Sequence, residues 1–231
     1  MIPLHDNIPS QRRPFVTWAL IVLNVLAALL TFNAPPDLTV ALSMVPARLL
    51  AGFAESNPAE LATLFTSMFL HAGVMHLVGN MWFLYLFGDN VEDRLGHLGF
   101  LAFYLLAGLA GCGLQLGLDP ASAIPVLGAS GAISGVLGAY VLWYPNARVT
   151  TLVFLGFFIR TIGLPAVIFI GFWFLQNLFG FFVGGGGTAW GAHICGFAVG
   201  AVVGLIARFP RPPPRRHLRD VTWEEAGGWR R

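Results

Sequence analysis

The chain has 231 residues, of which 56% are hydrophobic and only 10% are charged, and this balance excludes an ordinary soluble globular domain. The formal net charge is +2, and no basic stripe marks a surface for nucleic acid. The two cysteines, Cys112 and Cys195, lie in apolar glycine-rich stretches, which favours buried free thiols over a disulfide. Composition therefore predicts an integral membrane protein.

A helix that crosses the hydrocarbon core needs about 20 mostly apolar residues. Six stretches reach or approach this length and predict an all-α polytopic membrane protein with one six-helix bundle: residues 15–32, 62–88, 99–118, 126–144, 164–183 and 188–208. The first stretch lacks a small-x-small cleavage site after it, so we interpret it as a retained helix rather than a signal peptide. The predicted domains are therefore a cytoplasmic segment at 1–14, the bundle at 15–208 and an arginine- and proline-rich cytoplasmic tail at 209–231.

The arginines predict the orientation of the bundle, because positive charges concentrate on the cytoplasmic flanks of membrane helices. With both termini in the cytoplasm, twelve of the 13 basic residues lie inside and only Arg48 lies outside. Residues 33–61 then form a long external loop, whereas 89–96 and 145–163 form internal connections. The apolar run 149–159 is too short to span, so we expect it to lie at the inner interface or to fold back.

Strongly polar side chains inside a membrane span cost a few kcal/mol each, so they mark candidate functional residues. The predicted spans contain no Asp or Glu, and the polar residues that we single out in them are His71, His76, Asn80, Ser130, Ser134, Gln176, Asn177 and His193. Ser130 and His193 each lie a few residues inside a helix that begins on the outer side, about 6–8 Å below the surface. His76 and Asn80 lie one turn apart on one face of the second span and can reach the same pocket.

A serine hydroxyl becomes a good nucleophile when a neighbouring base removes its proton, and histidine is the usual base near neutral pH. Ser130 and His193 can form such a pair, and the absence of a carboxylate in the spans predicts a dyad rather than a triad. The helix start at Gly128-Ala129-Ser130-Gly131 offers free N–H groups for an oxyanion. His76 and Asn80 can add side-chain donors.

Each of these polar residues also has a simpler, noncatalytic interpretation. A Gly-x-Ser-Gly sequence can be only a packing surface, and a single membrane histidine often only bonds to a neighbouring helix. We interpret Ser134 as a packing or hydrogen-bonding serine and Gln176 and Asn177 as interhelical hydrogen-bonding residues, and the role of His71 stays open. The last span carries glycines at four-residue spacing, which let helices approach closely: Gly196, Gly200 and Gly204.

Three motifs in this order resemble the rhomboid family of intramembrane serine proteases: His71-x4-His76-x3-Asn80, Gly128-Ala129-Ser130-Gly131 and Gly191-Ala192-His193-x2-Gly196-x3-Gly200. The turn at 91–96 also resembles a structural signature of that family. The resemblance implies the minimal six-helix prokaryotic form, in the cell (inner) membrane, with no metal or organic cofactor. It implies Ser130 as nucleophile and His193 as base, and an oxyanion hole made by the Ser130 amide with His76 and Asn80.

The expected reaction is hydrolysis of transmembrane or juxtamembrane segments of membrane proteins near the outer face, through an acyl-enzyme. Expected partners are such transmembrane substrates and the lipid bilayer, with no nucleic acid; the oligomeric state stays open. The alternative is a noncatalytic relative that binds membrane-protein clients, but such relatives typically lack the serine or histidine that this chain keeps. A transporter or channel would need ionisable residues along a path through the bilayer, whereas here they cluster on one side.

Two positions depart from the pattern of some family members. Ser134 stands where an aromatic residue supports the histidine ring, so the sequence does not identify the group that orients His193. The external loop has Arg48 after Val45-Pro46-Ala47 in place of a Trp-Arg pair. The resemblance also implies that the fifth span and the turn at 184–187 form the mobile element that admits substrate and water.

Overall fold

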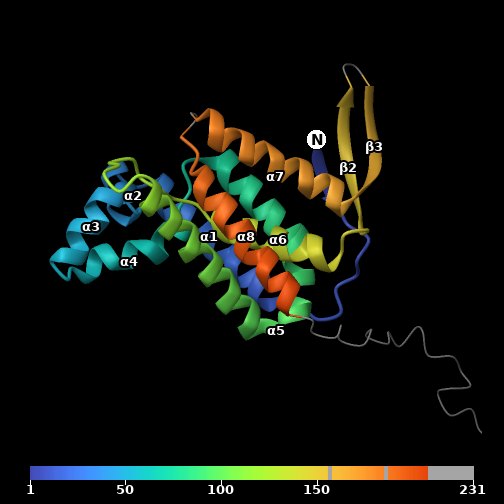
Figure 1. Cartoon of the computed structure of the whole chain (residues 1–231), viewed down its shortest axis with the longest axis horizontal. Helices are drawn as coiled ribbons and strands as arrows, with labels where there is room; N and C mark the ends of the chain where they lie inside the picture. Colours follow the sequence, from blue (N-terminus) through green and yellow to red (C-terminus); the bar gives the residue numbers. More distant parts are fainter. Residues whose placement is uncertain (156–157, 185–186, 208–231) are drawn as a thin grey trace, which may run out of the picture.

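The structure is a computed structural model that describes residues 1–155, 158–184 and 187–207. Within these ranges it is a bundle of apolar helices with a small sheet at one side (Figure 1). The arginine- and proline-rich tail predicted at 209–231 lies outside the described residues.

The bundle is built from α1 (Phe15–Phe32), α5 (Val74–Leu118), α6 (Ser130–Trp143), α7 (Ala166–Val183) and α8 (Trp190–Ile206). Of these, α1, α5 and α7 are long and apolar enough to cross a membrane, and α6 and α8 are shorter apolar helices. The 45-residue α5 contains a break at Gly96, whose φ of 71° and ψ of 167° are not helical. Glycine adopts this backbone without steric cost. The six predicted spans thus correspond to α1, the two halves of α5, α6, α7 and α8.

The second span starts later than predicted. Residues 62–73 are not part of one helix: they hold the end of α4 (Pro58–Thr66), the short 3₁₀-helix η1 (Ser67–Phe69) and a loop that carries His71. The apolar character of this stretch does not distinguish one long helix from two shorter ones joined by a loop, because both bury the same kind of residue.

The external loop is folded into α2 (Pro36–Leu42), α3 (Pro46–Ala54) and α4, each of which begins with proline in its first turn. Arg48 on α3 joins all three. Its Nε donates to Glu60 Oε2 at 2.7 Å, and its other nitrogens donate to carbonyl oxygens at the end of α2: Val40, Ala41 and Ser43. A single arginine therefore organises this loop without a neighbouring tryptophan.

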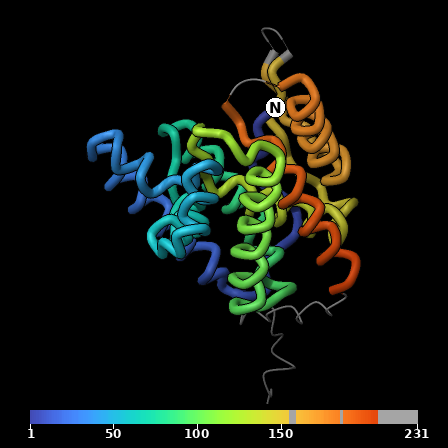
Figure 2. Tube along the Cα trace, turned by 60° about the vertical axis from the view of Figure 1, so that its left-hand side comes forward, coloured from blue at the N-terminus to red at the C-terminus, as the bar shows by residue number. Residues whose placement is uncertain are grey.

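The all-α prediction was wrong in one respect, because the structure contains a three-stranded antiparallel sheet in the order β1-β2-β3. The strands are β1 (Ile2–His5), β2 (Arg148–Leu155) and β3 (Phe158–Pro165). The run 149–159 therefore folds back as a hairpin, which is one of the two alternatives expected from the sequence. Its β-branched and aromatic residues fit a pleated strand well. In Figures 1 and 2 the hairpin projects beside α7, at the edge of the bundle.

The N-terminal segment is fastened to the bundle at its sheet end and at the start of α1. Trp82 Nε1 on α5 donates to the Pro3 carbonyl at 2.6 Å. The buried Glu92 accepts from the backbone N–H groups of Val16 and Thr17, which are free at the first turn of α1. The turn at 91–96 thus holds α1 against α5.

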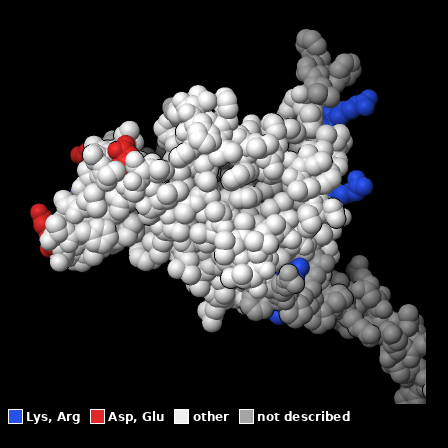
Figure 3. Space-filling model, viewed as in Figure 1, with Lys and Arg blue, Asp and Glu red and all other residues white. Residues whose placement is uncertain are grey.

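Charged side chains gather at two ends of the molecule (Figure 3). Acidic groups lie over the end built by α2, α3 and α4, and basic groups lie at the opposite end, near the hairpin and the end of α8. The surface between them is dominated by uncharged side chains in this view, as expected for a belt that faces lipid.

Candidate active site

Ser130 and His193, predicted as a pair from their common depth and their chemistry, lie in hydrogen-bonding contact. Ser130 is the first residue of α6, and His193 lies in the first turn of α8. The distance from Ser130 Oγ to His193 Nε2 is 2.7 Å. Two residues that are 63 positions apart in the sequence are thus brought together by two neighbouring helix starts.

Glycines on α6 and α8 allow this contact. A side chain on Gly196 would collide with the carbonyl group of Gly131, and one on Gly200 would collide with the carbonyl group of Gly135. Gly138 has the same relation to the Phe197 carbonyl. The predicted close approach of the last helix is confirmed, and its partner is α6.

The second ring nitrogen of His193 has a partner that sequence reasoning missed. His193 Nδ1 lies 2.7 Å from Oδ1 of Asn177 on α7, and Asn177 Nδ2 donates to the Trp173 carbonyl at 2.7 Å. The prediction that Asn177 bonds between helices is confirmed. A usable signal was its depth: counted from the outer end of α7 at Val183, Asn177 lies about 9 Å inside, close to the level of the serine and histidine.

Aromatic rings enclose the imidazole on two sides. The ring centroids of Trp173 and Trp190 lie 6.2 Å and 6.1 Å from that of His193. Ser134, one turn after Ser130, is buried and donates to the Ser130 carbonyl at 2.6 Å, so its interpretation as a hydrogen-bonding serine is confirmed. The aromatic support that Ser134 does not supply comes instead from α7 and α8.

His76 and Asn80 lie in the first two turns of α5 and line the same cavity as Ser130 and His193. The Ala72 N–H donates to His76 Nδ1 at 3.4 Å, which leaves the proton on Nε2. Asn80 is 8% exposed, and its Nδ2 has no hydrogen-bond partner among the described residues. Two residues with side-chain donors therefore line the cavity that contains Ser130.

Gly128 has a φ of 126°, a conformation that favours glycine, and it lies directly against the His76 ring. A Cβ atom at this position would lie 3.0 Å from His76 Nε2. His71, whose role the sequence left open, is 1% exposed and packs edge-on behind His76, with ring centroids 5.1 Å apart. Gly128 thus leaves room for His76, and His71 supports it.

The cavity that holds these groups has a volume of about 480 Å³. Residues of α5, α6, α7 and α8 line it, and its polar residues include His76, Asn80, Ser130, Gln176, Asn177 and His193. Its size is within the range that admits a peptide segment or small ligand. Among the described residues, no group of three or more His, Cys, Asp or Glu is placed to hold a metal ion.

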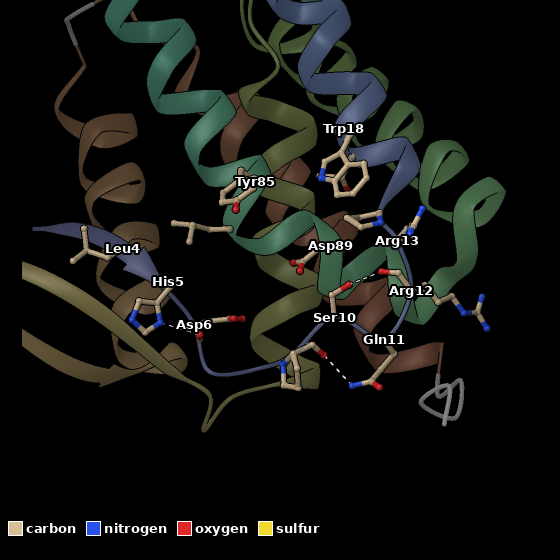
Figure 4. A pocket seen from close by; sticks show the side chains of 14 residues that line it. Leu4, His5, Asp6, Ser10, Gln11, Arg12, Arg13, Trp18, Tyr85 and Asp89 are labelled. Carbon is tan, nitrogen blue, oxygen red and sulfur yellow. Dashed lines mark hydrogen bonds between the residues drawn. The ribbon is translucent and has the colours of Figure 1, made fainter. Parts of the chain in front are cut away.

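A larger cavity, of about 710 Å³, lies between the N-terminal segment and the neighbouring parts of α1 and α5 (Figure 4). Asp6, Trp18, Tyr85 and Asp89 are among the residues that line it. No serine and histidine pair within hydrogen-bonding distance lies there among the described residues. Size alone would therefore select a cavity without such a pair, whereas the candidate nucleophile and base select the smaller one.

Comparison with known proteins agrees with these motifs. A protein-family profile described as Rhomboid domain matches residues 58–209. Rhomboid protease GluP of Bacillus subtilis (strain 168) is 36% identical over 145 residues, which are 62% of this chain and 26% of that protein. Rhomboid-like protein 11, chloroplastic, of Arabidopsis thaliana is 31% identical over 158 residues, which are 63% of this chain and 52% of that protein.

RHOMBOID-like protein 6, mitochondrial, also of Arabidopsis thaliana, is 42% identical over 76 residues, 33% of this chain and 24% of that protein. The chain thus spans between about a quarter and about a half of the length of these relatives. The profile covers most of the bundle, including all of α5, α6, α7 and α8. The chain belongs to the rhomboid family and is a multi-pass integral membrane protein.

Proposed function

We propose that the chain is an intramembrane serine endopeptidase that cleaves transmembrane or juxtamembrane segments of other membrane proteins near the outer face. The observation that carries this proposal is the 2.7 Å contact between Ser130 Oγ and His193 Nε2 inside a polar cavity of an otherwise apolar bundle. Buried polar groups are costly in a membrane protein, so their convergence on one cavity supports a catalytic role.

The reaction follows from this geometry. Ser130 Oγ attacks the substrate carbonyl carbon while His193 Nε2 accepts the hydroxyl proton. His193 then gives that proton to the leaving amine as the peptide C–N bond breaks, which leaves an ester on Ser130. Water attacks the ester, His193 accepts a proton from that water and returns it to Oγ, and the carboxylic acid product leaves.

The oxyanion of each tetrahedral intermediate needs hydrogen-bond donors. The Ser130 N–H at the start of α6 is one candidate, because the first N–H groups of a helix have no partner within the helix. His76 Nε2 and Asn80 Nδ2 are the others. An amide donor that is buried without a partner costs free energy in the resting protein, and an oxyanion would supply the missing acceptor.

Replacing Asn80 by alanine should lower kcat by about 10–100-fold, less than the largest losses for a single oxyanion donor, because the other two donors remain. The measurement is the rate of reporter cleavage at saturating substrate. Asn33→Ala is a suitable control, since Asn33 lies at the exposed end of α1 and, within the described part of the chain, its side-chain amide donates only to the Leu29 carbonyl. Equal rates for Asn80→Ala and the parent protein would remove Asn80 from the site.

We place both termini in the cytoplasm and the cavity on the outer side of a prokaryotic cell membrane. The separation of basic and acidic groups in Figure 3 supports this orientation, because arginine accumulates on cytoplasmic flanks. In this orientation the starts of α6 and α8, which carry Ser130 and His193, lie near the outer face. A substrate helix would have to unwind locally there to expose its carbonyl group, which favours helix-weakening sequences.

The decisive experiment incubates the purified protein with a transmembrane reporter and, separately, with a fluorophosphonate probe that reacts with activated serines. We expect cleavage of the reporter and labelling of the parent protein, and neither for Ser130→Ala. Labelling that survives in Ser130→Ala would contradict the assignment. Binding of the reporter with neither cleavage nor labelling of the parent would favour the alternative, a noncatalytic client-binding relative.

A further inference from the structure

Asn177 occupies an unusual position on α7. The buried residues of this helix are Ala166, Phe169, Ile170 and Asn177, so three of the four lie in its first two turns. In the outer half of α7, the buried residue is the polar Asn177, which is 5% exposed. General packing does not account for its burial, because the residues around it on the same half of the helix are at least partly exposed.

The contact with His193 fixes which ring nitrogen carries the proton. Asn177 Oδ1 can only accept a hydrogen bond, so at 2.7 Å it requires a proton on His193 Nδ1. A neutral imidazole then presents an unprotonated Nε2, and this is the atom that lies 2.7 Å from Ser130 Oγ. The opposite tautomer would place a proton between Nε2 and Oγ and remove the base.

The orientation of the amide is itself determined by its surroundings. Asn177 Nδ2 donates to the Trp173 carbonyl one turn earlier on α7, at 2.7 Å. A flipped amide would set its oxygen against that carbonyl oxygen, so that two acceptors would face each other and the hydrogen bond to Trp173 would be lost. Oδ1 is therefore held on the imidazole side.

We propose that Asn177 is the positioning residue for His193, so that Ser130, His193 and Asn177 form a hydrogen-bonded Ser-His-Asn triad across α6, α8 and α7. This inference rests on the proposed protease function. Asn177 makes no contact with the serine; it acts by holding the imidazole in one tautomer and one orientation. It takes the place that a carboxylate fills in many serine hydrolases, with a neutral acceptor that suits a site without acidic residues.

This triad has a consequence for substrate access. The nucleophile and the base come from α6 and α8, which pack through glycines, whereas the group that orients the base comes from the peripheral α7 (Figure 2). Any outward displacement of the outer half of α7 separates Asn177 from His193. The dyad is therefore fully oriented only when α7 is closed against α8, which couples closure of the cavity to activation of Ser130.

The test compares two variants. Asn177→Leu keeps the approximate side-chain volume but removes the hydrogen-bond acceptor, whereas Asn177→Asp keeps an acceptor oxygen. For Asn177→Leu we expect kcat and the fluorophosphonate labelling rate to fall by about 10–100-fold, by analogy with the groups that orient metal-binding histidines. Asn177→Asp should retain at least about ten times the activity of Asn177→Leu. Its acidic limb in the pH–rate profile should move to higher pH, because a carboxylate stabilises the imidazolium ion.

Asn24→Leu is the matched control. Asn24 on α1 is also fully buried, and its Nδ2 donates to the carbonyl one turn earlier, Leu20, at the same distance of 2.7 Å. It differs in having no contact with the dyad. We expect Asn24→Leu to alter thermal stability with little effect on kcat. Equal losses of kcat in Asn24→Leu and Asn177→Leu, or equal activity of the Leu and Asp variants at 177, would overturn the proposal.

A second measurement separates this inference from the proposed function. In protein labelled with ¹⁵N-histidine, the His193 signals are identified by their loss in His193→Ala. We expect the parent protein to show the Nδ1–H tautomer and Asn177→Leu to show a mixture of tautomers. An unchanged tautomer in Asn177→Leu would refute the positioning role even in an active enzyme, whereas the absence of cleavage and labelling in the parent would refute the protease function itself.

Discussion

Alanine at Ser130, at His193 or at both positions should lower the cleavage rate to the same residual level, about 10⁴–10⁶-fold below the parent protein. If the two side chains act as one unit across their 2.7 Å contact, removal of either group leaves the other without a function in the reaction. For the two single variants and the double variant, kcat is measured with the same transmembrane reporter. Where turnover is slow, the cleavage rate is measured under single-turnover conditions.

The prediction has a clear opposite outcome. If the losses in the single variants multiplied in the double variant, the two residues would act independently, and the dyad would be excluded. His5→Ala is a control, because His5 lies in β1 and, among the described residues, its ring bonds only to the backbone carbonyl of its neighbour Asp6. We expect this variant to cleave the reporter at the parental rate.

Leucine at Gly200 should separate α6 from α8 and reduce both stability and activity. The added side chain would occupy the space of the Gly135 carbonyl group, and a backbone carbonyl cannot move aside as a flexible side chain can. We expect the free energy of unfolding to fall by about 1–3 kcal/mol, as for other overpacked cores. A displacement of about 1 Å between Ser130 and His193 should lower kcat by about 10²-fold.

Gly113→Leu is the matched control, because a Cβ atom at Gly113 on α5 meets nothing within 4 Å. Thermal unfolding in detergent and reporter cleavage would be measured for both variants. Similar losses in Gly113→Leu and Gly200→Leu would mean that any large residue in these helices is harmful, and that the α6–α8 contact has no special role. A selective loss in Gly200→Leu would locate the effect at that contact.

The helix content and the main pair of the candidate site could be predicted because both depend on local sequence. A membrane span needs a minimum length of apolar residues, so α1, α6, α7 and α8 were found within a few residues of their bounds. A polar residue in such a span is costly, so Ser130 and His193 stood out. The depth of a residue follows from its distance to the end of its own helix.

The sheet could not be predicted in the same way. β1 and β2 are separated by more than 140 residues, and β1 alone is a four-residue strand. The pairing of Ile2 with Leu152 is a contact between two distant segments, and neither segment carries a local signal for the other. The sequence predicts the apolar run 149–159, but it leaves two alternatives for the conformation of this run.

By itself, the sequence determined the membrane class and the positions of the apolar segments, and it predicted a common depth for the polar groups and Ser130 and His193 as the candidate pair. The tertiary structure decided which helices are neighbours and how each is rotated about its axis. Those two quantities depend on packing between distant segments: glycines of α8 fit against the backbone of α6, and α7 turns Asn177 toward His193. The contact between Asn177 and His193 was therefore visible only in the folded molecule.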